Sequence, residues 1–409
     1  MSFIDYVEIN PSIKLEKGKE YPFIEMSSVD FYAREPQQID IKEYSSGVKF
    51  QRGDTVISRI EPCLQNGKSF FVKNISEGFG STEFLVFRPK DKKVNNEFLY
   101  YFLLTDGIRK SMINSMTGAT GRQRVNNDIF KSLEISLPSI KKQERIANIL
   151  STYDDLIENN QKQIKLLEEA AMRLYKEWFV NLRFPGYETT KIVDGVPEGW
   201  NKVTVNNALA YFIGGGWGKE AATGKHLIMG KVIRGTDINN IKKGNFLSVP
   251  LRYHTANDIT KRKLESNDMV FEISNGKIDN IGRCLFVDDL ILSSCGTHTI
   301  CASFCKLLRP KNLKTAVTLY YEINNMQLSG KMLPLKKNGT NGINNFDFDG
   351  FLAHEFLLPD NDKLVGILCK IMGKISNIQK RFFITRNARD KLLPKLISGE
   401  IKVPEEEDA

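Results

Sequence analysis

Residues 143–179 read QERIANILSTYDDLIENNQKQIKLLEEAAMRLYKEWF. Their apolar positions step by four and three in alternation, a heptad typical of a helix that packs along a partner helix. The positions are Ile146, Leu150, Tyr153, Ile157, Ile164, Leu167, Ala171, Leu174 and Trp178. Asn160 fills the one polar slot, where a single polar residue commonly fixes register and partner number. A helix of this length would span roughly 55 Å at ~1.5 Å per residue.

A second heptad segment lies near the end of the chain. It carries Leu364, Leu368, Ile371, Ile375, Ile378 and Phe382. We expect Asp360 to be its N-cap, and we expect the helix to stop around Pro394 and Ser398-Gly399. Because a whole globule separates the two segments, they can pair antiparallel, with one globule at each end of the rod. The alternative is that each helix packs as core on its own globule.

The chain also contains an internal repeat. Arg88-Pro89-Lys90 recurs as Arg309-Pro310-Lys311, and Leu137-Pro138 recurs as Leu358-Pro359, each pair 221 positions apart. The pairs Gly118-x-x-Gly121 with Gly339-x-x-Gly342, and Asp128-x-Phe130 with Asp349-x-Phe351, have the same offset. Runs rich in β-branched and aromatic residues predict strands over 54–60, 69–72 and 82–87. The repeat therefore predicts a tandem duplication of one mixed α/β module.

Composition limits the class of protein. The chain has 409 residues, 41% hydrophobic residues, a formal charge of +9 and six scattered cysteines. These values predict two or more globular domains with reduced thiols, and they suit a polyanionic partner without requiring one. No apolar run is long enough to span a bilayer and the first residues lack a signal-peptide pattern, so we expect a cytoplasmic protein with no membrane partner.

Several motifs together resemble one known family. The run from Leu137 to Ile146, LPSIKKQERI, and the run from Leu174 to Val180, LYKEWFV, look like the central conserved region of type I restriction-modification specificity subunits. Residues 196–200, VPEGW, resemble the entry to that family's second recognition domain. Residues 392–401, LLPKLISGEI, resemble its C-terminal close.

The resemblance implies an α+β chain with two similar target recognition domains in tandem and a pseudo-twofold coiled-coil spacer of two antiparallel helices. It implies target recognition domains at 1–137 and 188–357, helical spacers at 138–187 and 358–409, and an acidic tail within the last of these. The two domains would each read half of a split double-stranded DNA target, with spacing set by the helices. The second junction lacks the Gln-Glu-Arg-Ile sequence of the first, so the two docking surfaces are expected to differ.

The resemblance also implies partners. Two methyltransferase subunits would dock on the helices, and motor-nuclease subunits would join them for cleavage. S-adenosylmethionine, ATP and Mg would belong to those partners, and this chain would have neither a cofactor nor a catalytic role. The residues expected to build the spacer and docking helices are Ile146, Leu150, Tyr153, Ile157, Asn160, Ile164, Leu167, Trp178, Leu368, Ile371, Ile375, Ile378 and Phe382.

Polar and basic loops between strands are the places where side chains can reach phosphates or base edges. The loop of residues 117–124 and its repeat around 338–342 come first, because Arg favours guanine and Gln favours adenine in the major groove. The loop of residues 59–68 and its repeat at 274–277 come second, and residues 214–219 with Arg234 come third. The predicted DNA contacts are Arg59, Gln65, Asn66, Lys68, Arg122, Gln123, Arg124, Lys219, Arg234, Asn275, Lys277, Asn338 and Asn341.

Other signals are weaker. The spacing Cys295-x-x-His298-x-x-Cys301-x-x-x-Cys305 could indicate zinc, but the first copy has no cysteine at the matching positions, so small buried side chains explain it equally well and we predict no metal. The glycines at 214–218 lack P-loop spacing, and no Ser/His/Asp grouping stands out. A stand-alone DNA methyltransferase and a coiled-coil scaffold without a DNA role are the alternative functions.

Overall fold

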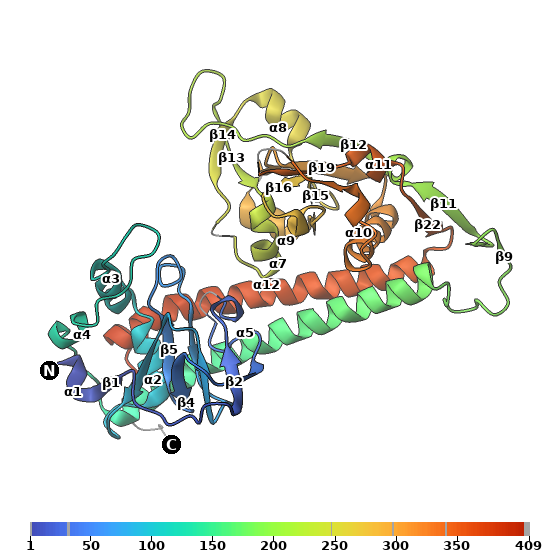
Figure 1. Ribbon diagram of the computed structural model, residues 1–409. Coiled ribbons are helices and arrows are strands. Elements are labelled where there is room, and N and C mark those ends of the chain that lie inside the picture. The colour runs from blue at the N-terminus through green and yellow to red at the C-terminus, as the bar shows by residue number, and fades with distance from the viewer. Residues whose placement is uncertain (1, 31–32, 247, 297, 340–341, 405–409) are drawn as a thin grey trace. The chain divides into compact units, whose positions relative to one another are not determined.

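The computed structural model describes residues 2–30, 33–246, 248–296, 298–339 and 342–404 (Figure 1). The chain forms two compact units. Unit 1 comprises Met1–Asn159 and Ile384–Ala409, and unit 2 comprises Asn160–Phe383. Two long helices, α5 (Ile140–Tyr175) and α12 (Asp362–Ser398), contribute residues to both units. The acidic tail predicted at 405–408 lies outside the described residues.

Unit 1 is built on two sheets. One has the strand order β1-β8-β5-β6 and the other β3-β2-β7-β4. Its elements are α1 (Phe3–Tyr6), β1 (Val7–Ile9), β2 (Glu20–Ile24), η1 (Met26–Ser28), β3 (Asp40–Glu43), β4 (Val48–Gln51), β5 (Thr55–Ser58), β6 (Ser69–Phe71), β7 (Glu77–Gly80), β8 (Phe84–Pro89), α2 (Asn96–Leu103), α3 (Asp106–Asn114) and α4 (Ile129–Ser132).

Unit 2 has corresponding sheets with the orders β12-β19-β15-β17 and β14-β13-β18. Its principal elements are β11 (Trp200–Thr204), α6 (Val205–Ala208), β12 (Leu209–Gly214), β13 (Ile228–Ile233), α7 (Ile238–Lys242), β14 (Leu251–His254), α8 (Ala256–Arg262), β15 (Met269–Glu272), β17 (Cys284–Phe286), α9 (Asp289–Cys295), β18 (Ile300–Cys301), β19 (Cys305–Pro310), α10 (Leu313–Leu328), α11 (Phe348–Leu352) and β22 (Glu355–Pro359). Its short elements are η2 (Lys176–Val180), β9 (Ile192–Val193), β10 (Val196–Pro197), η3 (Gly235–Asp237), β16 (Ser274–Asn275), η4 (Ile278–Asn280), η5 (Leu333–Leu335), β20 (Lys336–Lys337) and β21 (Asn344–Phe346).

The first sheets of the two units have matching strand orders, and the second sheets match except that the unit 1 sheet has a fourth strand, β4. In each unit the second sheet contains one parallel pair, β2 with β7 and β13 with β18, although the other pairings in these sheets are antiparallel. The central strand β8 lies between β1 and β5, and its counterpart β19 lies between β12 and β15. The tandem duplication and the α+β class predicted from the sequence are therefore confirmed in the topology.

The central strands explain why the sequence folds this way. Along β8, Leu85 and Phe87 face a core that includes α2 and α3, whereas Phe84 and Val86 face a core shared with the second sheet. A strand buried on both faces is a continuous apolar run rather than an alternating one. In β15 of unit 2, Met269 and Phe271 likewise face the α10 side while Val270 faces the β13 side.

The long helices pair antiparallel, and they also pack on the sheets' helices. In unit 1, Ile146 and Leu150 of α5 share a cluster with Leu393 and Leu396 of α12 and with Tyr101 of α2. In unit 2, the C-terminal end of α5 and the N-terminal part of α12 share a cluster with α10, whose members include Ala171, Tyr175, Val365, Leu368, Val317 and Tyr321. The two arrangements considered from the sequence, a helix pair and a core against each globule, therefore coexist.

The predicted spacer residues differ in burial. Buried members are Ile146, Leu150, Ile157, Asn160, Leu368, Ile375, Ile378 and Phe382, and half-buried members are Tyr153, Ile164, Leu167, Trp178 and Ile371. In unit 1, the buried pair Asp154 and Arg389 joins α5 to α12 with a 2.5 Å bond, and the Tyr101 hydroxyl donates to the same carboxylate at 2.6 Å.

Gln143 anchors the start of α5 to unit 1. Its amide accepts a hydrogen bond from the Asn95 N–H at 2.9 Å and donates to the carbonyls of Lys93 and Pro138, both at 2.9 Å. The side chain is 1% exposed. The junction before α12 is held by a different residue type. Lys314 Nζ donates to the Asp360 carbonyl and forms an ion pair with Asp362.

The start of α12 differs from the sequence expectation, whereas its end at Ser398 confirms the predicted stop at Ser398-Gly399. Asn361, not Asp360, lies before the first residue of α12, and its side chain accepts from the Lys363 N–H at 2.8 Å. Pro394 does not stop the helix, which continues to Ser398 before Gly399 adopts φ +77°. A proline removes one backbone donor, and here α12 continues for another turn. No helix in the described ranges is long and apolar enough to cross a membrane.

Candidate nucleic-acid interface

Two of the loops predicted to contact DNA lie together in unit 1. The Glu61 N–H donates to the Gln123 carbonyl at 3.0 Å, and the backbone groups of Arg59 and Val125 are joined by a 2.9 Å bond. Ile60 also forms an isolated bridge with Arg124. Loops that are about 60 residues apart in sequence, predicted as separate candidates, thus lie side by side.

Glu61 links the two loops through its side chain. One carboxylate oxygen accepts from the Gln65 amide at 3.1 Å, and the other accepts from the Gly121 N–H at 3.1 Å. Gly121 has φ +81°, a left-handed conformation that suits glycine. The carboxylate therefore sits between the loop of residues 59–68 and the loop of residues 117–124.

Arg124 is held by Glu83. Its Nε donates to both Glu83 carboxylate oxygens, at 2.9 and 3.1 Å, and its Nη2 donates at 2.6 Å. Its Nη1 donates to the Arg122 carbonyl at 3.2 Å. The Arg124 guanidinium lowers the pKa of the Glu83 carboxyl below its usual value, so this pair is charged at neutral pH.

The remaining predicted DNA contacts of unit 1 differ in whether their side chains already have partners within the protein. Arg122 and Asn66 are exposed, and neither side chain has a hydrogen bond or ion pair within the described parts of the chain. Lys68 donates to the Met26 carbonyl at 2.7 Å. Arg59 donates from Nη2 to the Val125 carbonyl, while its buried Nε has no partner among the described residues.

One basic residue near these loops was missed by the sequence analysis. Arg109 of α3 donates to the Gln65 carbonyl at 3.3 Å. Arg109 lies in an amphipathic helix, and a pattern of polar loops between strands does not point to helical residues. The only available sequence signal was the pair Arg109-Lys110 on the polar side of that helix.

The repeat loops of unit 2 also come together. Strand β16, which begins the loop of residues 274–277, pairs with β21, and β21 pairs with β20. The Asn344 amide donates to the Gly276 carbonyl at 3.0 Å, and the Ser274 hydroxyl donates to Asn345 at 3.0 Å. Here neutral side chains make the contacts for which unit 1 uses Glu61.

The predicted residues in these unit 2 loops divide in the same way. Lys277 and Asn338 are exposed without side-chain partners in the described structure. Asn275 is occupied, because it donates to Glu272 at 2.7 Å and accepts from the Lys277 N–H at 2.8 Å. Asn341 lies outside the described residues.

The third predicted region lies against β14 rather than beside those loops. Lys219 pairs with Tyr253 through the backbone, at 2.8 and 2.9 Å, and its side chain is exposed. Beside it the Arg252 guanidinium lies 4.8 Å from the Trp217 ring centre. The Arg234 side chain is already occupied within the protein, because it makes a two-point ion pair with Asp237 at 2.9 Å and donates to the Ser248 carbonyl.

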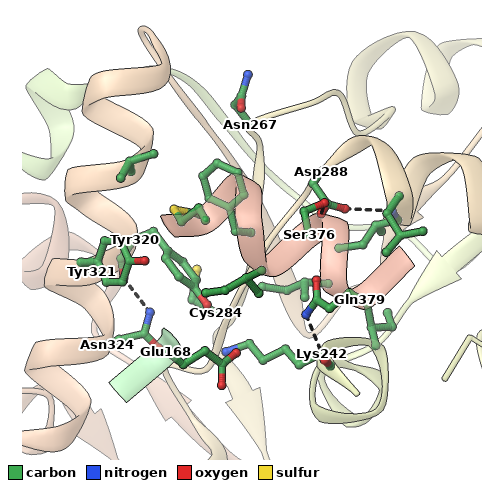
Figure 2. Close-up of a pocket in the computed structure, with 18 of the residues that line it drawn as sticks. Glu168, Lys242, Asn267, Cys284, Asp288, Tyr320, Tyr321, Asn324, Ser376 and Gln379 are labelled. Atoms are coloured by element: carbon green, nitrogen blue, oxygen red, sulfur yellow. Dashed lines mark hydrogen bonds between the residues drawn. The ribbon is translucent and has the colours of Figure 1, made fainter. Parts of the chain in front are cut away.

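Unit 2 also contains a cavity of about 830 Å³ between its parts of α5 and α12 and the elements α7, α9 and α10 (Figure 2). Ser376 donates to Asp288 at 2.6 Å across it, and Gln379 donates to the Lys242 carbonyl at 3.1 Å. Glu168 lies next to Lys242 at one end. No predicted DNA contact lines this cavity.

The cysteines of the suspected zinc spacing are buried thiols. Burial raises the pKa of Cys301 to about 12 and that of Cys295 to about 11. A thiol must lose its proton to ligate a metal, so this environment disfavours that chemistry. Among the described residues, no group of three or more His, Cys, Asp or Glu side chains is arranged to hold a metal ion.

Comparison with known proteins relates this fold to a family. Residues 8–169 match the model of the type I restriction modification DNA specificity domain. The type I restriction enzyme MjaIX specificity subunit of Methanocaldococcus jannaschii is 24% identical over 337 residues, which cover 78% of this chain and 71% of the relative. The HindI specificity subunit of Haemophilus influenzae is 33% identical over 134 residues, covering 32% of this chain and 28% of the relative.

A solved structure shares the fold over nearly the whole chain. The type I restriction-modification system S subunit from M. genitalium matches with a TM-score of 0.54 and 15% identity, covering 97% of this chain and 95% of that one. The family model matches only unit 1 and part of α5, but the duplicated topology extends the same module to unit 2. The chain is thus similar to type I restriction-modification specificity subunits, and its residues 8–169 match their DNA specificity domain.

Proposed function

We propose that this chain is the DNA-reading subunit of a type I restriction-modification complex. Unit 1 reads one half of a bipartite duplex target through the loops of residues 59–68 and 117–124. Unit 2 reads the other half through the loops of residues 274–280 and 336–344. The chain recognises its target and leaves catalysis to its partners.

The observation that carries this proposal is the repeated convergence of two polar loops. In unit 1 the loops meet through Glu61 and Gly121, and in unit 2 they meet through Asn344 and Gly276. Each convergence presents at least one exposed cation, Arg122 in unit 1 and Lys277 in unit 2. Cations of this kind neutralise phosphates or read guanine, so a duplicated surface suits two separate half-sites.

The helices α5 and α12 set the spacing in this proposal. Both are continuous over 36 and 37 residues and contribute to both units. Their remaining exposed surface is where two methyltransferase subunits dock, and the motor-nuclease subunits join through that assembly. S-adenosylmethionine, ATP and Mg are bound and used by those partner subunits. The complex works in the cytoplasm.

Matched heptad insertions test the spacing. Seven residues inserted after Asn160 in α5 and seven after Phe383 in α12 keep the packing seam in register. They lengthen each helix by ~10 Å, or roughly three base pairs at ~3.4 Å each. Single-molecule sequencing of N6-methyladenine in host DNA should then report unchanged half-sites with a longer unread spacer.

A matched control separates spacing from general disturbance. The same seven residues inserted after Glu188, in an exposed segment of unit 2, should leave both half-sites and spacer unchanged. Altered half-sites with an unchanged spacer would overturn the helical spacing. Loss of the gene without loss of any methylated motif would overturn the proposed role in DNA recognition.

A further inference from the structure

Arg122 and Arg124 lie two residues apart in the same loop and are both exposed, but only Arg124 has side-chain partners. Arg122 is exposed, and its guanidinium has no partner among the described residues. Arg124 donates three hydrogen bonds to Glu83 and a fourth to the Arg122 carbonyl. Sequence alone gives these two arginines the same prospects of contacting DNA.

The contacts of Arg124 connect three segments of unit 1. Its backbone exchanges hydrogen bonds with Thr117 at 2.9 and 3.0 Å, which closes the loop of residues 117–124. Its side chain reaches Glu83, just before β8. The Glu83 carbonyl in turn accepts from the Arg59 N–H at 2.8 Å. Arg124 thus ties the closed loop to the central sheet and to the neighbouring loop.

Base readout by Arg124 would break these bonds. An arginine reads guanine with two N–H groups directed at O6 and N7. The Arg124 N–H groups that form such a fork already point at the Glu83 carboxylate. Moving them to a base would leave Glu83 as an unpaired anion at a surface that approaches phosphates, which is unfavourable.

We propose that Arg124 is a positioning residue, and that its ion pair with Glu83 holds the loop so that Arg122 is the arginine presented to DNA. This inference rests on the proposed function. Glu61 completes the support from the opposite side, because it accepts from the Gly121 N–H next to Arg122. Arg122 thereby becomes the specificity-determining or phosphate-binding cation of the first half-site.

A charge exchange tests the assignment. The full chain, assembled with its modification subunits, selects duplexes from a library randomised over both half-sites. Arg124→Ala and Glu83→Gln should each weaken binding about threefold to fivefold without changing the preferred base at any position. The double variant Glu83→Arg with Arg124→Glu restores the pair with its charges reversed, so it should recover most of the affinity.

Arg122→Ala gives the contrasting result. Loss of preference at one base pair of the first half-site, by about fivefold or more, would mark base readout, and uniform weakening with a lower salt slope would mark phosphate contact. Either outcome supports the division of roles. The second half-site, read by unit 2, is the internal control and should be unchanged in every variant.

Two results would overturn the proposal. One is a lost base preference in Arg124→Ala that the charge exchange fails to restore. If the exchanged protein does not fold, Arg124→Ala and Glu83→Gln are combined in one double variant instead. Two residues that act as a pair lose their interaction only once, so the double variant should bind DNA no more weakly than either single variant. Additive losses of affinity would be the second result that overturns the proposal. If the unaltered complex selects no sequence at all, the proposed function fails instead.

Discussion

Arg88 forms a bidentate ion pair with Asp54 by donating two parallel hydrogen bonds, Nε to Oδ1 at 2.7 Å and Nη2 to Oδ2 at 2.8 Å. Arg309 grips Asp268 in unit 2 through the same atoms, at 2.9 and 2.8 Å. Each aspartate is fully buried and also accepts from the N–H three residues before it. The two copies therefore share a buried charge pair down to its atoms.

Breaking this pair should destabilise either unit. Arg88→Ala and Arg309→Ala each leave a buried carboxylate without its cation, which should lower the free energy of unfolding by about 3 kcal/mol. Urea unfolding followed by circular dichroism measures the loss in both units, and tryptophan fluorescence follows unit 2, which contains Trp178, Trp200 and Trp217. Arg52→Ala, at an exposed arginine two residues before Asp54, is the control and should change stability by less than about 0.5 kcal/mol. Losses below about 1 kcal/mol in both pair variants would contradict the account.

The pair of Asp154 and Arg389 should hold the two long helices together in unit 1. Both side chains are almost completely buried, at 1% and 2% exposed. Arg389→Ala should therefore cost about 3–5 kcal/mol, whereas the apolar replacement Asp154→Leu with Arg389→Met should recover much of that loss. Thermal unfolding measures both, with the exposed Arg381→Ala as control on the same helix. If the apolar pair were no more stable than Arg389→Ala, the loss would not come from the uncompensated charge.

Thiol labelling should distinguish the cysteines. Burial raises the pKa of Cys284 and Cys301 to about 12, so at pH 8 both thiols stay protonated and shielded. Cys63 is partly exposed in the loop of residues 59–68 and should react first with a maleimide. Mass spectrometry of digested samples gives the rates. A duplex carrying the target should lower the labelling rate of Cys63 and leave the lower labelling rate of Cys369 in α12 unchanged. If the duplex does not change the labelling rate of Cys63, the DNA binds elsewhere.

Gly218 should be intolerant of a side chain. It has φ +74°, and a Cβ there would lie 2.6 Å from the Tyr253 carbonyl oxygen and 2.7 Å from His254. Gly218→Ala should therefore destabilise unit 2 by more than about 1 kcal/mol. Gly224→Ala is the matched control, with φ +55° and open space around its Cβ position, so it should cost less. Equal unfolding midpoints for the two variants would contradict the close approach.

The duplication and the fold class were predictable because their signals are local or repeated. The 221-residue offset pairs Arg88 with Arg309, and the structure gives these two residues the same partner and geometry. The strand expected over 54–60 contains β5, and the heptad of 143–179 lies almost entirely within α5. The loops around Arg122 and Gln65 were predicted only as separate candidates, and their proximity is seen in the fold alone.

Other features depend on partners far away in sequence. Nothing near Arg124 indicates that Glu83, 41 residues earlier, takes up its guanidinium. The same limit applies to the parallel pairing of β2 with β7. A loop pattern identifies residue types that suit DNA, but only the surrounding fold decides which of them are already occupied.

Gln143 sets a condition for building chimaeras from this chain. A foreign domain grafted ahead of α5 must bring a turn with a carbonyl and an N–H at the places of the Lys93 carbonyl and the Asn95 N–H. Otherwise the buried Gln143 amide loses these hydrogen-bond partners, which is unfavourable. A domain taken from ahead of α12 makes its junction through Lys314 instead, which donates to the Asp360 carbonyl. The two reading modules are therefore related by descent but are not interchangeable parts, and crossovers should be cut inside α5, beyond Gln143.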